Sequence, residues 1–127
     1  MELFKWHELY SVNNEELDNH HKTLCSILNK LYENCMGPEI PNSLDSIVDE
    51  LVSYSNYHFT AEEQHMRDIG YKDIDKQIIE HKEFTQKALQ LKKVIDKNDI
   101  EHTKELIVFL GSWILHHVME NDKKYSA

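Results

Sequence analysis

The 127-residue chain is poor in the residues that end helices, with only three glycines and two prolines. Its apolar residues recur at intervals of three and four rather than two, which is the period of an amphipathic helix. The pattern therefore predicts a nearly all-helical protein. The length suits one domain with a real hydrophobic core.

Basic residues are also scarce, with 14 lysines and arginines against 23 acidic residues and a formal charge of −9. This balance argues against binding to nucleic acid or to an anionic membrane surface, because both need a basic face. No apolar run approaches the roughly 20 residues of a membrane span, and the first five residues lack the features of a signal peptide. We expect a cytoplasmic protein and, since the bundle needs no partner for burial, a monomer.

Cysteine is nearly absent. Cys25 and Cys35 lie on one predicted helix, about 15 Å apart along its axis, so they cannot form a disulfide without destroying that helix. This spacing agrees with a reducing compartment.

Four helices are predicted, at about Asn14 to Met36, Ser43 to Ile69, Asp73 to Asp96 and Asp99 to Asp122. Each has one apolar stripe, and the breaks between them are short enough to reverse the chain. The predicted fold is all-α: an antiparallel up-down-up-down four-helix bundle with an N-terminal arm, in a single domain over residues 1–127.

Metal-type side chains lie symmetrically about the three breaks. His58 and His81, for example, are equally far from the Ile69/Gly70 midpoint. Because the rise per residue is constant, mirror-image positions return to the same height in an antiparallel bundle. The residues that share this symmetry are His21, His58, Glu62, Gln77, His81, His117 and Asp122. Asp122 lies off the stripe, five residues beyond His117, and joins the others only if the helix frays or bends near its end.

Several ionisable groups on inward faces need a common partner, because an unpaired buried charge costs several kcal/mol. A metal centre meets this need. Five or more imidazole and carboxylate groups exceed what one tetrahedral zinc uses, so two metals bridged by carboxylates fit better, with iron preferred. A ferritin-like site expects more glutamates than this set contains, and only Glu62 and His65 match its Glu-x-x-His motif.

The chain resembles the hemerythrin family, specifically its single-domain bacterial members, over nearly its whole length. The matching segments include residues 18–22, 58–63 and 113–117, together with Trp6, Tyr10, Met66, Tyr71, His81, Phe84, Asp122 and Tyr125. The resemblance implies a four-helix bundle that holds two iron ions with a bridging oxo or hydroxo group and binds dioxygen.

The same resemblance implies a role for each site residue. Glu62 and Asp122 bridge the irons, His21 and His58 bind the iron that takes dioxygen, and His81 and His117 bind the other iron together with a third histidine. It also suggests an apolar oxygen pocket formed by Leu24, Phe59, Trp113, Ile114 and Val118.

Gln77 stands where the family has that third histidine. An amide oxygen is a weak iron ligand compared with imidazole, so we expect either a direct contact from Gln77 or, by preference, a water on that iron. We expect the oxygen adduct to be shorter-lived than in the usual family member.

Two functions remain open at this stage. The preferred one is oxygen carriage, storage or delivery without catalytic turnover. The alternative is a di-iron redox enzyme, such as a peroxidase, oxidase or nitric oxide scavenger, for which Gln77 is the supporting feature. An oxygen or iron sensor is a third possibility, weakened because no signalling domain accompanies the bundle.

Overall fold

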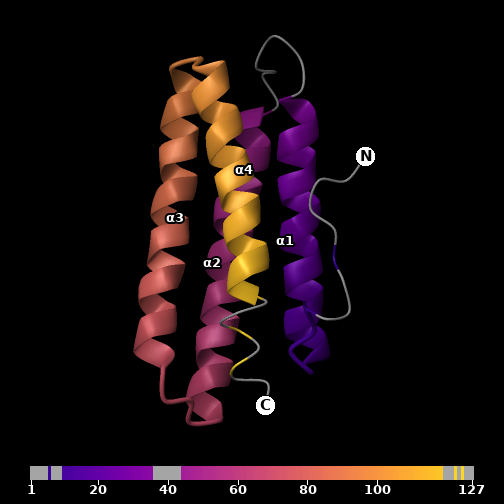
Figure 1. The fold of residues 1–127 in the computed structure, drawn as a ribbon, viewed down its shortest axis with the longest axis vertical. Coiled ribbons are helices and arrows are strands. Elements are labelled where there is room, and N and C mark those ends of the chain that lie inside the picture. Colours follow the sequence, from indigo (N-terminus) through magenta and orange to yellow (C-terminus); the bar gives the residue numbers. More distant parts are fainter. Residues whose placement is uncertain (1–5, 7–9, 36–43, 119–121, 123, 125–127) are drawn as a thin grey trace.

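The structure is a computed structural model that describes residues 6, 10–35, 44–118, 122 and 124. Four helices follow one another along the chain: α1 (Glu15–Asn34), α2 (Leu44–Asp68), α3 (Ile74–Asp96) and α4 (Ile100–His116). They form an antiparallel bundle in which α1 packs on α2 and α4, and α3 packs on α2 and α4 (Figure 1). The all-helical bundle predicted from the sequence is confirmed.

Side-chain caps begin two of the helices. The Asn14 side chain accepts a hydrogen bond from the Leu17 amide, and the Asp99 side chain accepts one from the His102 amide. Each cap satisfies one of the amides that the first helical turn leaves without a partner. The predicted starts at Asn14 and Asp99 therefore mark cap positions, while the predicted start at Ser43 lies outside the described residues.

Two left-handed residues end the second and third helices. Gly70 has a φ of +67° and Asn98 a φ of +57°. The amides of the next residues, Tyr71 and Asp99, donate hydrogen bonds to the carbonyls of Met66 and Val94, five residues earlier in the chain. This is the Schellman arrangement, which satisfies terminal carbonyls and stops the helix. The predicted breaks after the second and third helices therefore reverse the direction of the chain.

The helix ends differ in detail from the predictions. Ile69, the predicted end of the second helix, lies one residue beyond α2 and is 49 % exposed, whereas Met66 is fully buried. α4 ends at His116 rather than near Asp122, and a wider π-turn follows at 117 and 118. Met36, the predicted end of the first helix, lies outside the described residues.

The N-terminal arm is pinned to α1 by the Asp18 carboxylate. It accepts hydrogen bonds from the Ser11 hydroxyl at 2.6 Å and from the Val12 amide at 2.8 Å. Farther along the arm, the Trp6 ring meets Tyr10 edge to face and lies 6.1 Å from the His21 ring, centroid to centroid. The arm therefore covers α1 beside one of the predicted metal ligands.

Apolar packing divides into a large cluster and a small one. The large cluster runs through all four helices, and the small one joins Val12, Leu17 and Met66 near the Gly70 turn. Cys25 and Cys35 are buried in the large cluster and do not form a disulfide with each other, as their spacing predicted. No helix among the described residues is long and apolar enough to span a membrane.

Candidate metal centre

The seven predicted site residues are all buried inside the bundle, and none is more than 3 % exposed. α1 supplies one of them, α2 two, α3 two, and the end of α4 with the turn beyond it supplies the last two. The residues are His21, His58, Glu62, Gln77, His81, His117 and Asp122. Six of them bring their ligand atoms together, and Gln77 lies one turn before His81 on α3. Their roles as metal ligands stay a prediction.

Glu62 lies at the middle of the cluster. Its Oε2 atom is 3.2 Å from Nε2 of both His21 and His58. Its Oε1 atom is 2.9 Å from Nε2 of His81 and 3.9 Å from Nε2 of His117. The two oxygens of one carboxylate thus face two different histidine pairs.

Asp122 also turns its two carboxylate oxygens toward different histidine pairs. Its Oδ2 atom lies 3.3 Å from His21 Nε2, and its Oδ1 atom lies 3.0 Å from His117 Nε2. A regular helix would have turned this side chain away from His117, but the π-turn at 117 and 118 changes its direction. Such turns are often found at functional sites. The sequence-based condition, that the helix must bend for Asp122 to join the site, is met.

Two overlapping groups of possible metal ligands result. One contains His21 and His58, the other contains His81 and His117, and both include Glu62 and Asp122. Within each group the ligand atoms lie within 4.8 Å of one another. Imidazole nitrogen and carboxylate oxygen together suit first-row transition metals such as iron. The clusters can therefore hold metal ions on both sides of the shared carboxylates.

Three polar side chains contact the outer nitrogens of the histidines. Glu63 Oε2 lies 2.8 Å from His81 Nδ1, and Glu80 Oε2 lies 3.0 Å from His117 Nδ1. His20 Nδ1 lies 3.1 Å from His58 Nδ1 and is only 5 % exposed. An acceptor on Nδ1 fixes the tautomer that directs the Nε2 lone pair inward.

The sequence interpretation assigned no role to Glu63 or Glu80. A signal for Glu80 existed, because Glu80 and His117 centre within half a residue of Asp99, as Gln77 and Asp122 do. His20 precedes the predicted ligand His21 and is buried against His58. His116, which precedes His117 in the same way, is exposed.

The charges of the site are strongly coupled. Burial lowers the pKa of His21, but hydrogen bonds to Asp122 and Glu62 outweigh it and raise that pKa to about 9. Burial likewise lowers the pKa of His81, but hydrogen bonds to Glu62 and Glu63 outweigh it and raise that pKa to about 9. Burial dominates at His58 and lowers its pKa. The surrounding histidines, led by His58, outweigh burial and hold the pKa of Glu62 well below its usual range.

The five residues of the expected oxygen pocket lie beside this cluster. Four are buried, and Trp113 is half-buried against the large apolar cluster. Phe59 stacks on the His81 ring at 4.1 Å, and Trp113 stacks on the His117 ring at 4.5 Å, centroid to centroid. The remaining members, Leu24, Ile114 and Val118, are in the same apolar cluster.

Gln77 is 2 % exposed, and neither its amide nitrogen nor its amide oxygen has a hydrogen-bond partner among the described residues. Gln77 is therefore buried on α3, one turn before His81.

Comparisons with known proteins agree with this arrangement. The chain is 32 % identical over 127 residues to the bacteriohemerythrin of Clostridium acetobutylicum, covering 97 % of this chain and 98 % of that one. It is 27 % identical to the myohemerythrin of Theromyzon tessulatum, covering 99 % and 93 % of the two chains. A crystal structure of wild-type hemerythrin matches with a TM-score of 0.85 and 26 % identity, covering 98 % and 95 %.

The family model described as the hemerythrin HHE cation binding domain matches residues 12–127. This match covers both histidine pairs and both shared carboxylates. The chain therefore belongs to the hemerythrin family.

Proposed function

We propose that this protein holds a di-iron centre and binds dioxygen there for carriage, storage or delivery. Hemerythrins are known for oxygen binding at two irons. The observation that supports the proposal most directly is the sharing of Glu62 and Asp122 by both groups of ligand atoms. A carboxylate that turns one oxygen toward each group is suited to bridging two metal ions.

The donor set fits iron. Each side offers imidazole nitrogens with carboxylate oxygens, and the cysteines lie elsewhere in the apolar core. Two carboxylates with 0 % exposure also need positive charge nearby, which protonated histidines or metal ions supply. In this proposal His21 and His58 hold one iron, His81 and His117 hold the other, and both carboxylates bridge, beside an oxo or hydroxo group.

When bound, the iron pair supplies the electrons and the binding position that dioxygen needs. The protein's own residues control what reaches that pair. Glu63 and Glu80 hold the imidazoles of His81 and His117 with Nε2 facing inward. Leu24, Phe59, Trp113, Ile114 and Val118 form an apolar wall that excludes water. Keeping protons away from bound oxygen favours its release unchanged rather than its reduction.

A second candidate function is a di-iron peroxidase, oxidase or nitric oxide scavenger, and Gln77 is the observation that favours it. An amide binds iron more weakly than the imidazole it replaces, which leaves the second iron open to reactants. Binding without turnover remains our preferred proposal, in a single domain over 1–127 that works as a cytoplasmic monomer.

Anaerobic reconstitution with ferrous iron tests the proposal. Iron is counted per chain, and the visible spectrum is followed as oxygen is admitted and then removed. Two irons with a reversible charge-transfer band support oxygen carriage. Two irons with rapid irreversible oxidation, and turnover with peroxide or nitric oxide, favour the enzyme. Fewer than two irons contradict both candidates. A Gln77→His variant is the matched control, expected to keep its oxygen adduct longer.

A further inference from the structure

Gln77 is the buried polar side chain whose position the metal-ligand set explains least. Both ends of its amide are buried without a hydrogen-bond partner among the described residues. Two other buried polar groups are satisfied locally, since Ser55 donates to the Val52 carbonyl and Thr103 donates to the Asp99 carbonyl. A buried amide without a partner is unfavourable, so a group that hydrogen-bonds to it there is favoured.

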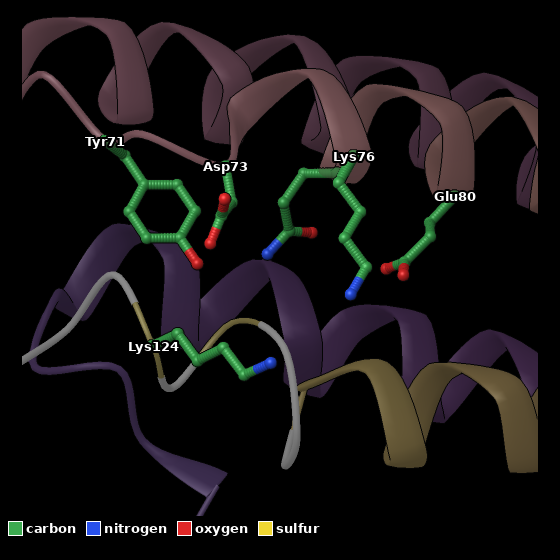
Figure 2. Close-up of a pocket in the computed structure, with 6 residues that line it drawn as sticks. Tyr71, Asp73, Lys76, Glu80 and Lys124 are labelled. Atoms are coloured by element: carbon green, nitrogen blue, oxygen red, sulfur yellow. The ribbon is translucent and has the colours of Figure 1, made fainter.

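A small cavity of about 20 Å³ lies against this amide, enough to hold about one water molecule. Its lining is polar throughout: Tyr71, Asp73, Lys76, Gln77, Glu80 and Lys124. Figure 2 shows Lys124 approaching from the C-terminal segment, across the cavity from Lys76 and Glu80 on α3. Asp73, Lys76 and Lys124 are exposed, whereas Gln77 is buried. The cavity therefore leads from solvent to the amide.

The same cavity adjoins the second metal group through a residue that contacts one of its ligands. Glu80 lines it and also contacts His117 Nδ1 at 3.0 Å. Another hollow, of about 280 Å³, reaches His81 beside Phe59 and Glu63. There the His81 Nδ1 atom is already held by Glu63 at 2.8 Å. The hollow beside Gln77 differs in ending at a buried amide that has no hydrogen-bond partner among the described residues.

We propose that this cavity is the entry of a second ligand site, which takes water, hydroxide or a small anion such as azide or hydroperoxide beside Gln77. The inference rests on the proposed di-iron centre and adds a binding position on its His81 and His117 side. One atom of the ligand lies against the Gln77 amide, and the rest extends toward Lys76 and Lys124. The Gln77 amide nitrogen donates to the ligand, and the lysines attract anions to the entrance.

This route differs chemically from the apolar wall of the oxygen pocket. Dioxygen is apolar and needs no cation at its entrance, whereas a small anion gains from two lysines and a hydrogen-bond donor. The site therefore separates two ligand classes by their path: dioxygen through the apolar side, and anions with water through the polar side at Gln77.

Azide titration of the iron-loaded, oxidised protein tests the inference. We expect two azide ions per iron pair in the wild-type protein and one in Gln77→His, read from the charge-transfer band and by calorimetry. One azide in both proteins, with two irons loaded, overturns the inference and leaves the di-iron proposal standing. Fewer than two irons in the wild-type protein refutes the di-iron proposal and the inference with it.

Charge variants test the entrance separately. Lys76→Met with Lys124→Met should weaken the second azide by about twofold to fivefold per lysine, as expected for exposed charges, and leave the first azide unchanged. Lys82→Met is the matched control, because Lys82 is an exposed α3 lysine that lines the other hollow. A loss in Lys82→Met but not in the Lys76 and Lys124 variant contradicts the proposed route.

Discussion

The two histidine pairs of the site share both carboxylates but differ in what surrounds them. His81 and His117 present their outer nitrogens to Glu63 and Glu80. Within the part of the chain that the structure describes, no carboxylate contacts the outer nitrogens of the other pair. There His58 contacts a neighbouring histidine, and the outer nitrogen of His21 has no hydrogen-bond partner among the described residues.

This difference lies on the side where the family resemblance places Gln77 in the position of a third histidine. A carboxylate on the outer nitrogen makes an imidazole a stronger donor. In the proposed di-iron site, two such imidazoles would offset a weak amide ligand, so the second metal position would keep its affinity while it opens to exogenous ligands. The carboxylate partners and the proposed open position would thus lie on the same side.

Removing the charge of Glu62, which both histidine pairs share, should affect both metal positions alike. We expect Glu62→Gln to lose both irons, because the carboxylate belongs to both groups of ligand atoms. Iron per chain after reconstitution is the measurement. Glu83→Gln is the matched control, because Glu83 is an exposed α3 glutamate outside both groups, and it should still load both irons. If Glu62→Gln keeps one iron firmly, the two positions do not depend on a common bridge.

The pH dependence of the free energy of unfolding, measured on the metal-free protein, tests one histidine from each pair. His21 and His81 have a pKa of about 9 when folded, against 6.5 as the ordinary value. Their stabilising effect is complete below pH 6.5 and is lost as the pH rises toward 9, because the unfolded chain then binds fewer protons. Urea unfolding should show a decline on the order of a few kcal/mol across this window.

Single variants show how much of that decline in stability each histidine causes. His21→Gln and His81→Gln should each remove about half of the slope. Because metal binding needs neutral imidazole, iron loading should also release protons at neutral pH. A flat unfolding free energy between pH 6.5 and 9 would show that neither histidine keeps its proton in the folded state.

Much of this arrangement follows from spacing, and its exceptions have physical causes. Gly70 and Asn98 adopt left-handed conformations at breaks expected from the sequence, so the mirror-image rule holds across them. The rule holds only inside regular helices. Asp122 lies beyond the end of α4, and a π-turn, which spacing does not encode, brings it to His117.

The carboxylate partners illustrate a second limit. Helical spacing places a residue at a height and on a face, but contacts with outer nitrogens depend on how far a side chain reaches sideways. Glu63 follows an inward residue and Glu80 precedes one, so both stand at the edge of the buried stripe. Both side chains are partly buried, at 19 % and 24 % exposure. Mirror spacing places Glu80 level with His117, but only the packed helices show the contacts that both glutamates make.

The carboxylate partners themselves can be tested by comparing the sides. Glu80→Gln keeps the size of the side chain but removes its charge, and we expect an about 10-fold to 100-fold weaker metal affinity at the His117 side. His20→Gln is the corresponding change at His58 and should have a smaller effect, since no charge is lost. Competition with a chelator measures both. Equal losses would mean that charge on the outer partner does not distinguish the sides.

The smallest expected effect concerns the arm that covers His21. The Lys22 ammonium lies 5.7 Å from the centre of the Trp6 ring, and that ring in turn lies over the His21 side of the site. Lys22→Ala removes an exposed cation–π contact, which contributes about 0.5–1 kcal/mol. We expect a loss of that size in the free energy of unfolding, with Lys87→Ala, at a similar contact with Phe109 far from the metal ligands, as the control. Only Lys22→Ala should also speed iron loss from the His21 side, because only there does the aromatic ring lie beside a ligand. Equal rates of iron loss in the two variants would mean that the arm packs on α1 without protecting the metal centre.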